Sequence, residues 1–234
     1  IGLNRHRVEL SVQLLSTVAE LMHAFPSLVK VSVSATVIQI AWQAGWCATF
    51  AYAYEGGAPS AALLFLLFSF FWTSQLVRAV MHATVAGVIG TWYFHSPNVP
   101  PQPTQRALHR ALTTSLGSLC FGALVAAPLQ VLRAVARRAS GVGAPASVRS
   151  LGLCLLGFVD VLVRFFNDFA YTQVAIYGKH FTLASWDTWT LLVRHSGVDA
   201  LMQRDMVGSA LALGAAASGL LTSLIAAYWA RAAF

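Results

Sequence analysis

Residues 61–95 read AALLFLLFSFFWTSQLVRAVMHATVAGVIGTWYFH, and this stretch decides the fold class. Its first half is a continuous apolar run, and the whole is longer than the roughly 20 residues that a helix needs to cross the hydrocarbon layer. Polar side chains enter in the second half, before Gly87 and Gly90. Small residues at four-residue spacing, such as Ala83 and Gly87, allow close contact between helices. We therefore expect a membrane span that is tilted or broken.

The composition of the whole chain agrees with a membrane location. Hydrophobic residues make up 57% of the 234 residues and charged residues only 10%, whereas a soluble domain has about 25% charged residues. Because helices satisfy their backbone hydrogen bonds internally in lipid, the fold class predicted is an all-α, polytopic transmembrane helical bundle. It forms a single domain over 1–234, with membrane segments at 27–54, 61–95, 111–132, 151–176 and 206–230. The chain begins with Ile1 rather than Met, and we expect it to be a fragment with flanking spans missing.

The N-terminal segment 4–24 has a different pattern. Apolar residues recur at spacings of three and four on one helical face, whereas polar and charged residues occupy another face, and this is the pattern of an amphipathic helix. The apolar face contains Val8, Val12, Leu15, Ala19 and Met22. We expect this segment to lie along the membrane surface.

Basic residues lie mainly at the ends of the apolar runs. The formal net charge is +7, but this placement is typical of topology determinants and of contacts with anionic lipids. Nucleic acid is therefore excluded as a partner, and membrane lipids are expected. The turn at 55–60 has no Lys or Arg, which predicts the non-cytoplasmic side, whereas Arg106 and Arg110 predict a cytoplasmic loop. Both ends of the segment 111–132 are basic, so either it re-enters the membrane or the rule fails there.

Neither a metal site nor a disulfide framework is predicted. Cys47, Cys120 and Cys154 are single residues in apolar runs, and we interpret them as packing residues. His82 shares a helical face with Arg78, four residues earlier, but no second histidine lies at a ligand spacing. A packing histidine is therefore the alternative to a role of His82 beside a substrate. No cofactor and no catalytic residue are predicted.

Charges and amides also enter the segment 151–176. A charge at the centre of a bilayer costs roughly 2.5–3.5 kcal/mol even on the low scales, so such residues usually face a protein interior or a water-filled path. Asp160 and Arg164 are four residues apart and share a face, so an internal ion pair is one interpretation. If the segment is cytoplasmic, these side chains are only solvated. Asn167 and Asp168 follow on the next turn.

Three ordered blocks of sequence resemble the choline transporter-like family, especially its fungal and protist "pH nine-sensitive" branch. The first block comprises residues 71–78, 82–87 and 90–93. The second is 115–122 with Gln130 and Arg133, and the third combines Asn167, Ala170, Tyr171, 175–179 and Phe181. The resemblance extends over roughly 5–234. Whole transporters of this family have about ten spans, so the chain is similar to their middle and C-terminal part.

The resemblance implies a multi-pass protein of the cell membrane that moves choline, or a related small organic cation or solute, across the plasma membrane. A quaternary ammonium has no N–H to donate, so its binding relies on aromatic faces, each contributing about 0.5–2 kcal/mol. We expect the substrate path to include Trp72, Gln75, Arg78, His82, Trp92, Tyr93, Asp160, Arg164, Asn167, Tyr171 and Tyr177. Interface anchoring is the alternative for Trp92 and Tyr93, which close a helix. Gly178 and Lys179 should end or bend the helix that carries Tyr171.

Two other classes of function remain as alternatives. A membrane-embedded enzyme of lipid headgroup chemistry would use the same polar residues as an active site. The sequence has no paired histidine metal motif and no serine in a glycine-flanked elbow, so we predict that the chain is not an enzyme. A membrane scaffold without transport activity is the other alternative.

Overall fold

The computed structural model describes residues 2–96, 98–139 and 146–194, together with residues 216, 219 and 223. The chain divides into a unit of residues 25–190 and a unit that combines 1–24 with 191–234. The described ranges contain seven α-helices and no strand. The prediction of an all-α membrane helical bundle is therefore confirmed.

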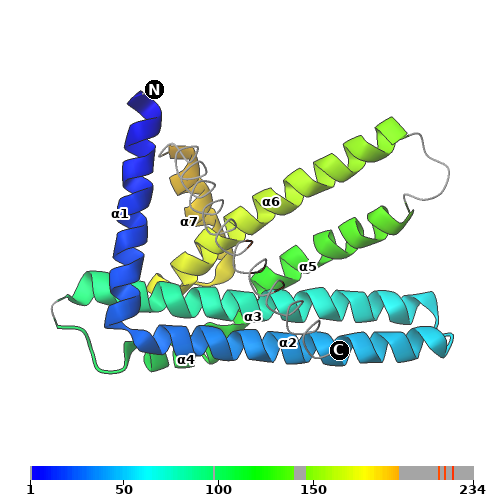
Figure 1. The fold of residues 1–234 in the computed structure, drawn as a ribbon, viewed down its shortest axis with the longest axis horizontal. Helices are drawn as coiled ribbons and strands as arrows, with labels where there is room; N and C mark the ends of the chain where they lie inside the picture. Colours follow the sequence, from blue (N-terminus) through cyan, green and yellow to red (C-terminus); the bar gives the residue numbers. More distant parts are fainter. Residues whose placement is uncertain are drawn as a thin grey trace. The chain divides into compact units, whose positions relative to one another are not determined.

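The helices have well-defined bounds along the chain. They are α1 (Gly2–Ala24), α2 (Pro26–Glu55), α3 (Ser60–His95), α4 (Pro103–Leu112), α5 (Leu116–Ala139), α6 (Ala146–Tyr177) and α7 (Phe181–Arg194). Helix α1 covers the segment that was expected to be amphipathic, and its location on a membrane surface stays a prediction. Within the unit of residues 25–190, α3 is the central element because it packs against α2, α4, α5 and α6 (Figure 1).

Helices α2 and α3 form a long antiparallel hairpin (Figure 1). Pro26 occupies the first turn of α2, where its missing N–H would have no helical partner. The connecting turn places Gly57 at φ +67°, a conformation that favours glycine. Across the hairpin, Trp46 donates from Nε1 to the carbonyl oxygen of Leu66 at 2.9 Å, and Gln39 donates from Nε2 to Ser74 Oγ at 2.9 Å.

Helix α3 is continuous over 36 residues, so the expectation of a break in this segment is wrong, and the alternative of a tilted span stays a prediction. Its glycines instead allow close contact with neighbouring helices. A Cβ atom on Gly87 would lie 3.3 Å from Cβ of Ala107 in α4, and one on Gly90 would lie 3.0 Å from Cγ1 of Ile176 in α6. Close packing accounts for these small residues without any interruption of the backbone hydrogen bonds.

A helix break does occur, but between α4 and α5. The sequence interpretation began a membrane segment at residue 111, whereas the chain forms the short helix α4, breaks at residues 113–115 and resumes at Leu116. Two helix-end carbonyl groups receive side-chain hydrogen bonds at the break. Thr113 Oγ1 donates to the carbonyl of His109 at 2.7 Å, and Thr114 Oγ1 donates to that of Arg110 at 3.1 Å. Both carbonyl groups also accept a backbone N–H bond, from Thr113 and Ser115 respectively, at 3.0 Å, so the hydroxyl groups add a second hydrogen bond at each acceptor.

Helix α6 ends where the sequence predicted. Its last residue is Tyr177, and Gly178 follows at φ +68° with its N–H bonded to the carbonyl oxygen of Val174 at 3.0 Å. This is the left-handed glycine that commonly terminates a helix. Lys179 then pairs with Asp187 of α7 and lies over the ring of Tyr177, with Nζ 5.2 Å from the ring centroid.

Two of the described helices are long and apolar enough to cross a membrane: α3 and the Leu116–Ala136 part of α5. The number rises to three if the end of α1 and α2 count as one broken span. The predicted segment 206–230 lies outside the described residues, apart from residues 216, 219 and 223. Many side chains of the predicted segment 151–176 also lie outside them.

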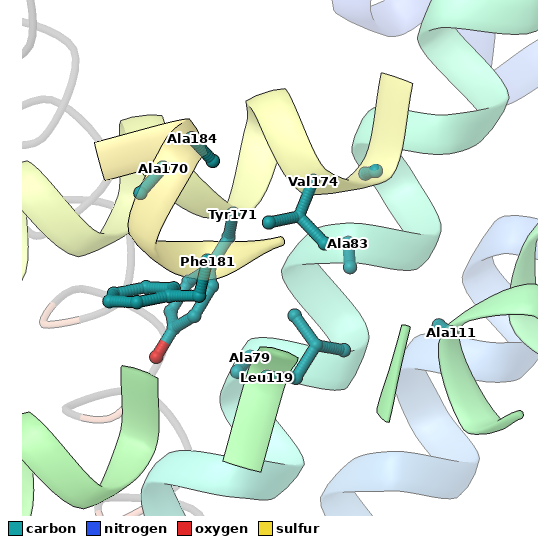
Figure 2. Packing of buried hydrophobic residues seen from close by; sticks show 10 residues of the cluster. Ala79, Ala83, Ala111, Leu119, Ala170, Tyr171, Val174, Phe181 and Ala184 are labelled. Carbon is teal, nitrogen blue, oxygen red and sulfur yellow. The ribbon is translucent and has the colours of Figure 1, made fainter. Parts of the chain in front are cut away.

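Small and apolar side chains form the core where α3 to α7 meet. Figure 2 shows Leu119 of α5 and Val174 of α6 beside Ala79 and Ala83 of α3, with Tyr171 and Phe181 next to one another. The alanines let the helix backbones approach closely. This core borders the polar site on one side because Ala79 and Tyr171 belong to both.

The three cysteines are free thiols in the structure. Cys120 is partly buried, whereas Cys47 and Cys154 are exposed. The interpretation of all three as packing residues therefore fits only Cys120.

Candidate functional site

A small polar cavity lies where α3, α5 and α6 meet. Two turns of α3, one alanine of α5 and two turns of α6 form its wall: Gln75, Arg78, Ala79, Ala126, Asn167, Asp168 and Tyr171. Its volume is about 10 Å³, which is the room that one water molecule needs. The cavity combines a positive charge, a negative charge, two amides and a phenol in an otherwise apolar bundle.

An ion pair between Arg78 and Asp168 links α3 to α6 across this cavity. Arg78 Nη2 lies 3.5 Å from Asp168 Oδ2. The arginine side chain is 49% exposed and the aspartate side chain 15% exposed, so the two charges have unequal environments. Arg78 lies at the centre of the 36-residue helix α3, a depth at which an intramembrane charge is expected to have a partner.

Asn167 and Tyr171 hold α6 against the backbone of α5. The buried Asn167 donates from Nδ2 to the carbonyl oxygen of Gly122 at 3.1 Å. Tyr171 is one helical turn later on the same face, and its ring is 5.8 Å from that of Phe181. A Cβ atom on Gly122 would lie 2.5 Å from ring atoms of both aromatic residues. Glycine is therefore required at this contact.

His82 extends the polar network by one turn of α3. Its Nε2 lies 3.0 Å from Thr172 Oγ1, and Thr172 donates its hydroxyl hydrogen to the carbonyl oxygen of Asp168 at 2.9 Å. Because that hydroxyl has a single hydrogen, the network assigns the donor role toward Thr172 to His82 Nε2. His82 is 6.4 Å from Tyr171, measured between ring centroids, so it contacts the part of α6 that carries Tyr171 and Thr172.

Trp72 is fixed next to the cavity but does not line it. Its Nε1 donates to the carbonyl oxygen of Cys120 at 3.3 Å, and its ring stacks on that of Phe68 with centroids 6.2 Å apart. Of the five aromatic residues expected along the path, only Tyr171 contributes to the cavity wall. Among the described residues, Tyr171 is therefore the one aromatic side chain in the cavity wall, and these residues form no aromatic box around it.

Three other aromatic candidates lie away from the cavity. Trp92 and Tyr93 are in the last turn of α3, and Tyr93 is 72% exposed. Tyr177 is 59% exposed at the end of α6 beside Lys179. Tyr93 is 15 residues from Arg78 on a continuous helix, a separation of roughly 22 Å at 1.5 Å per residue. The side chains of Asp160 and Arg164 lie outside the described part of the chain.

Two functional candidates were missed from the sequence. Asp168 was noted beside Asn167 but was not placed in the substrate path, because its partner Arg78 is 90 residues away and no local pattern pairs them. Gly122 was included in the second motif block, but its role as the contact point for Asn167 and Tyr171 depends on tertiary packing. The four-residue spacing of Asn167 and Tyr171 is that of one helical face, and both residues line the cavity.

Fold and site together define an all-α integral membrane protein with a charged and polar cavity inside its helical bundle. Comparison with known proteins then identifies the family. A family model described as "Plasma-membrane choline transporter" matches residues 1–234, the whole chain. The chain belongs to the choline transporter-like family.

Individual relatives agree with this assignment. A CTL-like protein of Dictyostelium discoideum is 31% identical over 233 residues, which cover 95% of this chain and 42% of the relative. The protein PNS1 of Kluyveromyces lactis is 31% identical over 258 residues, covering 97% of this chain and 46% of the relative. PNS1 of Cryptococcus neoformans is 32% identical over 254 residues, with coverages of 97% and 46%. The chain thus spans less than half the length of these relatives.

Proposed function

We propose that the full-length protein to which this chain belongs moves choline, or a related small organic cation or solute, across the plasma membrane. Family membership supports transport as the activity. The observation that carries the proposal is the cavity with the Arg78–Asp168 ion pair at the centre of α3. Charges inside membrane segments are costly, and they commonly mark the paths of substrates and ions.

The size of the cavity sets a requirement for this function. A volume of about 10 Å³ is far too small for an organic cation that contains several methyl groups. Transport therefore requires that α3, α5 and α6 separate at the cavity, or that Arg78 moves outward, when the substrate enters. Alternating access of this kind, around a site near the bilayer midplane, is the usual mechanism of secondary transporters.

We propose transport rather than lipid headgroup catalysis or a scaffold role. The described polar network connects helices across the bundle interior, where a path would run: Arg78 to Asp168, His82 to Thr172 and Asn167 to the Gly122 carbonyl. A scaffold would not need charged groups at this depth. The family model is also named for a transporter.

Uptake into vesicles tests the proposal directly. The full-length protein is reconstituted, and the entry of radiolabelled choline is measured alone and with a panel of competing organic cations that includes ethanolamine. We expect saturable uptake and displacement by those cations that share the transported headgroup. Uptake no greater than in protein-free vesicles, for choline and for every labelled cation of the panel, would contradict the proposal.

A further inference from the structure

The two members of the Arg78–Asp168 pair differ in how firmly they are held. Asp168 has a short side chain that is 15% exposed. The neighbouring Asn167 bonds this part of α6 to α5, and the Thr172 hydroxyl donates to the main-chain carbonyl oxygen of Asp168. Arg78 carries a long side chain that is 49% exposed, and such a side chain has many accessible rotamers. The guanidinium is thus the group of the pair that moves more readily.

We propose that Asp168 is the carboxylate that receives the cationic group of the substrate, and that Arg78 is a tethered cation that occupies this carboxylate while no substrate is bound. The inference rests on the proposed function in one respect, namely that the substrate is a cation. Arg78 then competes with the substrate for the Asp168 carboxylate. Substrate entry then exchanges one cation for another at Asp168.

The strength of the ion pair permits such an exchange. The N–O distance of 3.5 Å is longer than the roughly 2.7–2.9 Å of a charge-assisted hydrogen bond between such groups, so the pair is loosely held. The carboxylate, in contrast, is mostly buried, and a buried charge from which a cation is withdrawn is unfavourable. Arrival of another cation at Asp168 offsets the loss of Arg78 from this carboxylate.

The rest of the cavity wall suits an organic cation. The aromatic residue Tyr171 lines the cavity on the same helical turn as Asp168, and Gln75 and Asn167 contribute amides that can bond a hydroxyl group. Because a quaternary ammonium cannot donate a hydrogen bond, a carboxylate charge and a single aromatic face supply its main attractions. Outward movement of Arg78 would also enlarge the cavity next to these groups.

Thiol modification at position 78 tests the inference without requiring transport. Arg78→Cys is made in full-length protein whose native cysteines, including Cys47, Cys120 and Cys154, are replaced. The thiol is treated with two methanethiosulfonates, one carrying a trimethylammonium-ethyl group and the other a sulfonatoethyl group. Each forms a mixed disulfide and releases methanesulfinate. The first reagent presents a choline-like headgroup to Asp168.

We expect the ratio of the cationic to the anionic modification rate to be at least tenfold higher at position 78 than in the control Glu55→Cys, which is at the exposed end of α2. Adding Asp168→Asn should abolish the excess, whereas Asp168→Glu should retain it. Equal ratios with aspartate and asparagine at position 168 would overturn the inference. If the asparagine variant fails to fold, loss of the excess in the folded glutamate variant overturns it equally.

Protection by choline completes the test. Choline should slow modification of Arg78→Cys at least tenfold while leaving Glu55→Cys unchanged, and the absence of protection in a protein that takes up choline would overturn the inference. The proposed function fails separately. The proposed function is contradicted when the unmodified protein takes up none of the organic cations tested, whatever the modification rates at position 78.

Discussion

Asn167 of α6 donates a hydrogen bond from Nδ2 to the main-chain carbonyl oxygen of Gly122 in α5, at 3.1 Å. The same glycine lies directly against the rings of Tyr171 and Phe181. One point of α5 backbone is therefore held by an amide and by two aromatic side chains. This contact fixes the distance between two of the three helices that form the cavity.

Replacing Gly122 with alanine should destabilise the bundle. The new Cβ atom would lie 2.5 Å from ring carbons of Tyr171 and Phe181, and such overpacking costs about 1–3 kcal/mol. The matched control is Gly117→Ala in the same helix, where no atom lies within 4 Å of a Cβ. Thermal unfolding in detergent, followed by size-exclusion fluorescence, should show a lower Tm for Gly122→Ala alone. Equal Tm values for the two variants would refute the tight contact.

Replacing Arg78 with leucine should alter transport without loss of expression. The change removes the guanidinium that pairs with Asp168, so we expect a lower KM for a cationic substrate and a lower Vmax, because release of the cation from Asp168 becomes slower. Arg106→Leu, on the exposed face of α4, is the control. Wild-type KM and Vmax in the Arg78 variant, at wild-type expression, would remove Arg78 from the path.

Two substitutions at Tyr171 separate an aromatic role from a hydroxyl role. Tyr171→Phe keeps the ring that packs on Phe181 and lines the cavity, whereas Tyr171→Leu removes it. If the ring face binds the cation, phenylalanine retains affinity and leucine loses about tenfold, which corresponds to about 1.4 kcal/mol. Competition binding with labelled choline measures both affinities. Equal losses, or none in either variant, count against a cation-binding ring.

Leucine at this position also opens space in the core, so its folding needs a separate check. Phe181→Leu alters the same aromatic contact from α7 but leaves every residue of the cavity wall in place. A Tm loss common to both leucine variants reports packing. A loss of affinity confined to the Tyr171 variant then reports binding.

The fold class was predictable because it depends on local composition. Long apolar runs with few charges specify membrane helices wherever their partners lie. The end of α6 was predictable for the same reason, since Gly178 at φ +68° is a local stop signal. The sequence left the segment around Gly87 and Gly90 either tilted or broken, but both glycines lie within the continuous helix α3 and contact Ala107 and Ile176.

The candidate site was predictable only in part. The expected substrate path included Gln75, Arg78, Asn167 and Tyr171, and the structure brings these four residues together in the cavity wall. The ion pair of Arg78 with Asp168 joins residues 90 positions apart, and one sequence has no signal for such a contact. Helix α4 was missed although Pro103 at its start and the buried Thr104, Ala107 and Ala111 form a short amphipathic pattern.

The two ends of α3 should lie on opposite sides of the membrane. A continuous helix of 36 residues is about 54 Å long at 1.5 Å per residue, more than the roughly 30 Å of the hydrocarbon layer. The test places single cysteines at Glu55 and Asn98, which are exposed next to the two ends of α3. Gly57 and Gln102 are not used because their φ angles are positive. An impermeant maleimide applied to intact cells should label Glu55→Cys alone.

Permeabilised cells provide the control, because both cysteines should then react. The direction follows from charge: the turn at 55–60 lacks Lys and Arg, whereas Arg106 and Arg110 follow Asn98, and basic loops favour the cytoplasm. Labelling of Asn98→Cys alone would keep the crossing but invert its orientation. Labelling of both cysteines in intact cells would show that α3 does not cross the membrane, and Arg78 would then no longer be placed at its midplane.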